Sequence, residues 1–216
     1  MALVPWGRAD ALRGRLAIDQ PPTHNMIVMA REPDAEADFT LQDFLSFDAP
    51  EGYRAELIDG EIVVTPPPDG NHERCIMRIV KQVLAASATP MDFSGQKGLI
   101  VPVVEGHGRV IPDITFAPAR LDLFLDAPTW MPATGVAMVV EVTSSSPDHD
   151  RNAKRRAYAA AQIPLYLLVD RQRHEVTLHG DTVRNEYTSS SMVRLGGGVK
   201  LPEPFSFTLE TESFVV

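Results

Sequence analysis

Hydrophobic residues recur along the chain in two patterns, one typical of strands and one typical of a helix. The run ELIDGEIVVT has two β-prone segments on either side of Asp59-Gly60, a dipeptide that favours a tight hairpin turn. The next long segment, HERCIMRIVKQVLAASA, has apolar residues spaced three and four apart, which predicts an amphipathic helix. We therefore expect the folded domain to open with a β-hairpin followed by a helix.

Further along, apolar runs predict more strands. GLIVPVV and RVIPDITF flank the turn sequence EGHG and predict a second antiparallel hairpin. VAMVVEV and PLYLLVD are almost entirely apolar, which is typical of central strands buried on both faces. The segment between them, SSSPDHDRNAKRRAYAAAQ, predicts a helix that begins at Ser146 and Pro147. HEVTLHG, YTSSSMVRL and FSFTLE indicate short edge strands.

The remaining segments show little periodicity. Residues 1–38 mix prolines with acidic residues and are expected to form a weakly ordered extension, which leaves one domain over residues 39–216. Residues 117–135 contain three scattered prolines and predict mostly loop, with a short turn of helix near LDLFL. The order of hairpin, helix, strands, helix, strand and small β segments predicts an α/β (α+β) fold in which helices flank a mixed sheet.

Composition narrows the classes of function. The chain of 216 residues is 44% hydrophobic and has a formal net charge of −9, so only a local basic patch would attract a polyanion. Its single cysteine, Cys75, rules out an intrachain disulfide and is expected to serve only for packing. Without an apolar run of the ~20 residues that span a bilayer, and without a signal-peptide pattern, a cytoplasmic protein with no membrane partner is expected.

Two carboxylates interrupt apolar strand runs. Asp113 lies in VIPDITF and Glu141 in VVEV, where an unpaired buried charge costs several kcal/mol. If VIPDITF is one strand, Ile111, Asp113 and Thr115 share a face, and neighbouring strands would bring the two acids together. A hard divalent cation would relieve their repulsion. Alternatively, Asp113 caps a loop at a strand end and Glu141 pairs with an arginine.

Lys154, on the predicted helix after Glu141, is a further charged residue in an apolar setting. Lys154 shares one helical stripe with Ala157, Tyr158 and Ala161, and this stripe is otherwise small and apolar. A lysine there is costly unless it meets an anion, and the two acids or a bound phosphate would serve. In the alternative, the aliphatic stem packs on the stripe and the ammonium group reaches water.

Several of these motifs together resemble a known family. The runs ELIDGEIVVTPPPDGNHER, PDITF and MVVEVTSSSPDHDRNAKRRAYAAAQIPLYLLVD resemble the Uma-two family of restriction-endonuclease-like proteins, within the PD-(D/E)xK phosphodiesterase superfamily. The resemblance implies a restriction-endonuclease-like core in which Asp113 and Glu141 hold Mg²⁺ or Mn²⁺ together with the Val142 carbonyl. The superfamily pattern places a lysine two residues after the glutamate, where this chain has Thr143, and Lys154 matches the place on the next helix to which the family moves it.

Two residues of the front half also match the resemblance. Glu56 matches an acid of the family's opening motif and would complete the metal shell, unless it is an exposed hairpin residue. His72 matches a histidine typical of the family and would bind phosphate or shuttle a proton, unless it only caps the helix. Lys154 would orient the attacking water or neutralise charge in the transition state.

The expected function is that of a metal-dependent phosphodiesterase, most simply a DNA endonuclease that works as a homodimer. Two alternatives remain: a catalytically inactive module for binding or assembly, and a hydrolase of a small phosphorylated substrate. The basic residues of RNAKRR, together with Arg171, Arg173 and His174, would supply positive charge for DNA. Equally, they form an ordinary solvated helix face.

Overall fold

The computed structural model describes residues 27–29, 40–103, 106–143 and 148–214, and its strands form three sheets. The first sheet has the order β1 (Ile27–Met29), β3 (Glu61–Thr65), β2 (Arg54–Ile58), β6 (Gly106–Val110), β5 (Gly98–Val103) and β8 (Trp130–Pro132). The second has the order β12 (Glu186–Arg194), β11 (Glu175–Val183), β10 (Leu165–Asp170), β9 (Met138–Val142), β7 (Ile114–Pro118) and β4 (Met91–Gly95). β13 (Gly198–Leu201) and β14 (Phe207–Glu210) form a small antiparallel pair.

Both predicted hairpins are present in the first sheet. β2 and β3 pair antiparallel, and Asp59 and Gly60 between them have φ values of 47° and 76°, as a tight two-residue turn requires. β5 and β6 form the second hairpin. Most of the predicted extension over residues 1–38 lies outside the described residues. The described part of it forms β1, a strand that the sequence pattern did not predict and that pairs with β3.

The second sheet is the centre of the fold. β9 and β10 are the predicted central strands, are buried along their whole length and run parallel to each other. The other pairings of this sheet are antiparallel, which confirms the predicted mixed sheet. β11 lies between β10 and β12, so the expectation that it is an edge strand is wrong, whereas β12 does lie at the edge.

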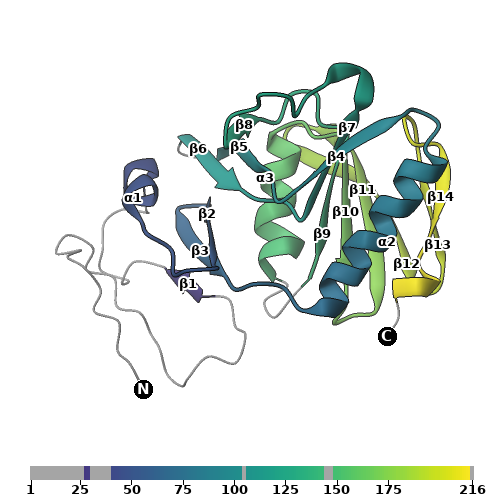
Figure 1. The fold of residues 1–216 in the computed structure, drawn as a ribbon, viewed down its shortest axis with the longest axis horizontal. Coiled ribbons are helices and arrows are strands. Elements are labelled where there is room, and N and C mark those ends of the chain that lie inside the picture. Colours follow the sequence, from purple (N-terminus) through teal and green to yellow (C-terminus); the bar gives the residue numbers. More distant parts are fainter. Residues whose placement is uncertain (1–26, 30–39, 104–105, 144–147, 215–216) are drawn as a thin grey trace.

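Helices cover the two faces of this sheet (Figure 1). The predicted amphipathic helix α2 (Gly70–Ala86) packs on one face through its buried residues, among them Cys75, Ile79 and Val83. The opposite face packs against the first sheet and α3 (Arg155–Ala160), with Tyr158 and Tyr166 fully buried between them. Cys75 therefore serves for packing, as predicted.

The helix between β9 and β10 begins in an unusual conformation. Its first part, η2 (His149–Lys154), is π-helical, and the chain continues from it directly into α3. The predicted start at Ser146 and Pro147 lies outside the described residues. A parallel strand pair needs such a helical crossover, so β9, the helix and β10 form one βαβ unit.

Shorter elements complete the chain. α1 (Leu41–Ser46) begins with a capping box between Thr40 and Asp43, and residues 117–135 contain η1 (Ala119–Leu121) and β8 within turns. η3 (Glu212–Phe214) packs beside α2. Among the described helices, none is both long and apolar enough to cross a membrane.

Candidate active site

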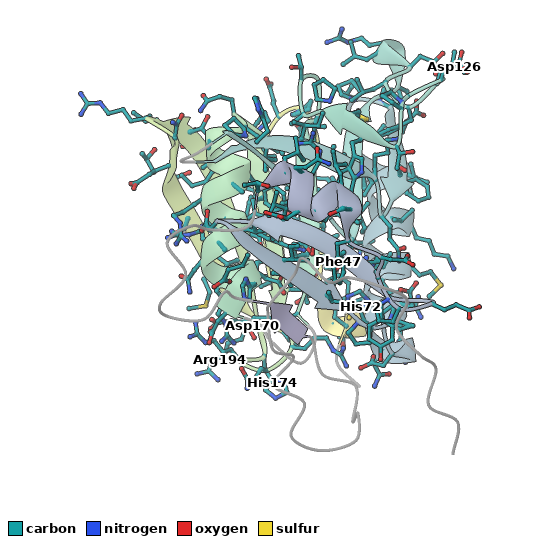
Figure 2. The ribbon with its side chains drawn as sticks, turned by 90° about the vertical axis from the view of Figure 1, so that its left-hand side faces the viewer. Phe47, His72, Asp126, Asp170, His174 and Arg194 are labelled. Carbon is teal, nitrogen blue, oxygen red and sulfur yellow. The ribbon has the colours of Figure 1, made fainter. Side chains whose placement is uncertain are left out.

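A cavity of about 670 Å³ lies where both sheets, the start of α2 and the π-helical segment η2 meet. All the side chains predicted to take part in catalysis or metal binding contribute to its lining: Glu56, His72, Asp113, Glu141 and Lys154. Figure 2 shows His72 and Asp170 toward the same end of the molecule, with Asp126 at the opposite end. The cavity therefore brings together residues that lie far apart in sequence.

Asp113 occupies a break between two strands. The chain leaves the first sheet at the end of β6 and enters the second at the start of β7, so VIPDITF is two strands and the expectation of one continuous strand is wrong. Ile114 is paired with Val140, which places Asp113 next to Glu141 across the ladder. The Val142 N–H donates to Asp113 Oδ2 at 2.9 Å. The two acids come together as predicted, although by a different backbone path.

His72 holds the same carboxylate from the side of α2. Asp69 is the N-cap of this helix and accepts from the His72 N–H at 2.8 Å, so the alternative in which His72 caps the helix is wrong. The His72 side chain is buried, and its Nε2 lies 3.0 Å from Asp113 Oδ2. Burial alone would lower the pKa of His72, but the hydrogen bond and the charge of Asp113 outweigh it and raise that pKa.

Asp113 is correspondingly held in its ionised form. Burial alone would raise the pKa of Asp113, but the hydrogen bond and charge of His72, followed by the charge of Lys154, lower it. Arg54 adds a further positive charge, with its Nη1 3.7 Å from Asp113 Oδ1. Asp113 Oδ1 accepts no hydrogen bond from the part of the chain that the structure describes, and an ionised carboxylate with such an oxygen suits a hard cation.

Glu141 has a different environment. Its Oε1 accepts hydrogen bonds from Lys154 Nζ, at 3.0 Å, and from the Tyr158 hydroxyl. Burial raises the pKa of Glu141 well above its usual range, and the nearby acids Asp113, Asp150 and Glu56 add to the rise against the opposing charge of Lys154. The helical stripe predicts that Tyr158 lies beside Lys154, but it does not predict the hydrogen bond from the Tyr158 hydroxyl to Glu141.

Lys154 lies between two carboxylates. Its Nζ is 3.0 Å from Glu141 Oε1 and 3.1 Å from Glu56 Oε2, and only 6% of the residue is exposed. The alternative in which its ammonium group reaches water is therefore wrong. Burial alone would lower the pKa of Lys154, but Glu141 and Glu56 raise it, so the group keeps its charge.

Glu56 connects Lys154 to the backbone of the segment between β6 and β7, which carries Asp113. It is buried, so the alternative of an exposed hairpin residue is wrong. Its Oε1 accepts from the Ile111 N–H at 2.6 Å, while Oε2 faces Lys154. Because both oxygens have partners in the protein, Glu56 positions the lysine and the segment that carries Asp113.

Asp150 is a further acid of the cavity that the sequence reasoning missed. It lies one helical turn before Lys154, with Oδ1 3.8 Å from Lys154 Nζ. Burial raises its pKa to about 7, against the opposing charge of Lys154. The signal for finding it was present, because Asp150, Lys154 and Tyr158 follow one another at intervals of four residues.

The predicted basic cluster is largely neutralised by acids. Four of its five arginines pair with carboxylates: Arg151 with Asp148 and Asp170, Arg156 with Asp59, Arg171 with Asp69, and Arg173 with Asp170 and Glu175. The fifth, Arg155, has no carboxylate partner among the described residues. Thr143, which stands at the superfamily's usual lysine position, is buried and accepts from the Arg171 N–H at 2.9 Å. The cluster therefore offers little uncompensated charge for a polyanion.

The oxygen atoms of the site are of the kind that bind Mg²⁺ or Mn²⁺. Within the described chain, no group of three or more His, Cys, Asp or Glu side chains forms a ready-made metal site. The Glu141 Oε2 and Asp113 Oδ1 atoms accept no hydrogen bond from the described residues. Two neighbouring carboxylates with free oxygens match the few protein ligands that Mg²⁺ uses, so the residues present fit such an ion.

The fold and the cavity define a class of protein. It has a nuclease-like mixed sheet flanked by helices, with buried acids at strand ends and a lysine from the adjoining helical segment. A family model described as "Putative restriction endonuclease" and named Uma2 matches residues 41–212, and the chain belongs to this family. A search among curated proteins finds no match. The fold is similar to the crystal structure of a putative nuclease from Anabaena variabilis, with a TM-score of 0.58 and 17% identity over 82% of this chain and 97% of that one. This likeness confirms the predicted fold.

Proposed function

We propose that the protein is a metal-dependent phosphodiesterase and that its substrate is DNA, which it cleaves as an endonuclease. One observation carries the proposal: Asp113, Glu141 and Lys154, which come from three separate segments of the chain, meet in one cavity with the lysine hydrogen-bonded to Glu141. Membership of a family described as "Putative restriction endonuclease" supports the same reaction class.

Asp113 and Glu141 would hold Mg²⁺ or Mn²⁺ together with the Val142 carbonyl. Glu56, the further ligand that the family resemblance implies, would instead position Lys154, because both of its oxygens have partners in the protein. When bound, such an ion polarises the phosphate and makes water a better nucleophile at neutral pH. Lys154 neutralises negative charge that builds up on the phosphate oxygens in the transition state. His72, hydrogen-bonded to Asp113, stands where it can take up or pass on a proton.

The decisive experiment measures cleavage of plasmid DNA with Mg²⁺ by the wild type, Asp113→Ala and Lys154→Ala. Each variant is expected to lose at least about a hundredfold in rate, as removal of single transition-state contacts typically does. Asp126→Asn is the control, because Asp126 is an exposed acid far from the cavity (Figure 2). Equal activity of all the proteins would refute the assignment.

A second candidate is hydrolysis of a small phosphorylated substrate. The neutralised arginines and a cavity of about 670 Å³, within the usual range for small ligands, favour it. Salt dependence separates the two candidates, because DNA binding weakens steeply with salt in proportion to the phosphates contacted. Turnover of a small phosphodiester such as bis(p-nitrophenyl) phosphate would change little over the same range of salt.

An inactive binding module would behave differently from both. Titration calorimetry with Mn²⁺ is expected to show one site in the wild type that is lost in Asp113→Ala, whereas an inactive module would show no such site.

For the DNA endonuclease we also propose a homodimer, because cleavage of both strands of a duplex needs two sites. Light scattering coupled to size-exclusion chromatography tests the dimer directly.

A further inference from the structure

Arg54 stands out among the cationic side chains of the cavity. It lies on β2 two residues before Glu56, so both side chains leave the strand on the same face, toward the cavity. Its Nη1 atom is buried and has no hydrogen-bond partner among the described residues. The nearest acid atom, Asp113 Oδ1, lies 3.7 Å away, which is too far for a hydrogen bond.

The other arginine of the cavity lining contrasts with it. Arg171 donates through both Nη1 and Nη2 to Asp69 Oδ2, each at 3.1 Å, and so has its charge compensated. Lys154 is likewise held between Glu141 and Glu56. Among the described lysine and arginines of the cavity lining, Arg54 is the one whose charged donors are not committed to the protein.

A buried donor without a partner costs about 1–3 kcal/mol, more when it is charged, so an arrangement of this kind favours a ligand that completes it. A guanidinium group presents a planar fork of N–H donors that matches the oxygens of a phosphate. Arg54 lies beside Asp113, which the proposed function makes a metal ligand. A phosphate bound at this acid would have its non-bridging oxygens next to Arg54.

We infer that Arg54 is a substrate-binding residue whose guanidinium donates to a non-bridging oxygen of the phosphodiester that reaches Asp113. This inference rests on the proposed function. It adds the Arg54 guanidinium to Lys154 as a second positively charged side chain that contacts the substrate phosphate. A purely structural role, in which Arg54 only balances the charge of Asp113, would leave the affinity for substrate unchanged.

The test measures binding of a fluorescein-labelled DNA duplex by anisotropy, with Ca²⁺ in place of Mg²⁺ so that binding is observed without cleavage. Arg54→Met is expected to weaken binding by about tenfold or more and to reduce the slope of log K against log salt by about 0.9, the value for one lost contact to duplex DNA. Arg120→Met is the control, because Arg120 is an exposed arginine outside the cavity lining, and it is expected to stay within about twofold of the wild type.

Arg54→Lys keeps the charge but loses the fork, and it is expected to bind several-fold more weakly than the wild type. It carries the test if Arg54→Met does not fold, as judged by urea unfolding. Wild-type affinity and salt slope in the folded Arg54 variants would overturn the inference, as would the absence of any binding by the wild type. Cleavage is scored separately, so weakened binding without nuclease activity in any protein would retain Arg54 and reject the endonuclease.

Discussion

Asp113 and Glu141 lie side by side in the cavity, yet their surroundings differ. Asp113 receives a backbone N–H, the His72 ring and the charge of Lys154, which lower its pKa. Glu141 receives Lys154 and Tyr158 but faces three other acids, and burial raises its pKa. Because both carboxylates are buried, the balance between neighbouring donors and neighbouring acids, rather than burial itself, gives their two pKa shifts opposite directions.

The largest effect that would test this comparison comes from replacing Lys154, the positive charge that lies near both acids. Lys154→Met leaves Glu141 and Glu56 buried without their positive partner, and the loss is expected to be about 3–5 kcal/mol in free energy of unfolding near pH 8. Without the lysine, the pKa of Glu141 rises further in the folded state, so its protonation at lower pH removes the unpaired buried charge. The loss should therefore shrink toward pH 5.

Urea unfolding of the wild type and Lys154→Met at both pH values measures this prediction. Arg156→Met is the control, because Arg156 pairs with Asp59 at the surface and such pairs contribute at most about 1 kcal/mol. An equal loss at pH 5 and pH 8 would mean that the carboxylates are not the source of the effect.

The next effect concerns the Glu141 side alone. Tyr158→Phe removes the hydroxyl that donates to Glu141 and leaves a buried carboxyl oxygen with one donor fewer, which is expected to cost about 1–3 kcal/mol. Tyr187→Phe is the matched variant, since the Tyr187 hydroxyl donates to the less deeply placed Ile163 carbonyl and should cost about 0.5–1.5 kcal/mol. Thermal and urea unfolding compare the two, and a smaller cost for Tyr158→Phe would contradict the dependence of Glu141 on this donor.

The smallest effect concerns the Asp113 side. The pKa of His72 is raised in the folded state by Asp113, so protonated His72 contributes stability that is complete below pH 6.5 and lost as the pH rises through its folded-state pKa. His72→Gln is therefore expected to lower the free energy of unfolding by about 1 kcal/mol at pH 5.5 and by less at pH 9. Urea unfolding at the two pH values measures it, and a larger loss at pH 9 would show that the pair does not depend on protonation.

Much of the fold was predictable because its main signals are local. The fully apolar runs of β9 and β10 and the spacing of apolar residues in α2 identified the central strands and the first helix. β1 was missed because a strand of three residues has too few positions to show a period. The alternating pattern of β11 is typical of an edge strand, and it does not reveal that β12 pairs with the free side of β11.

The site was predictable where a residue conflicts with its surroundings, and not where its partner is distant. Lys154 was found because a lysine on an apolar stripe needs an anion. The face of Asp113 was inferred from strand alternation, which fails where the chain changes sheets. The burial of Glu56 could not be read from its hairpin, because its partner Lys154 lies on an element much later in the chain.

The π-helical segment η2 has a further consequence. Each residue of an α-helix turns the following side chains by about 100°, and each residue of a π-helix by somewhat less, so removing one residue between Asp150 and Lys154 would rotate these two side chains relative to each other and to Glu141. The number of residues in η2 is thus constrained more tightly than their identity. Insertions and deletions should be tolerated in the turn-rich connection around Asp126, and a single one within η2 should abolish the arrangement while most of the hydrophobic core stays intact.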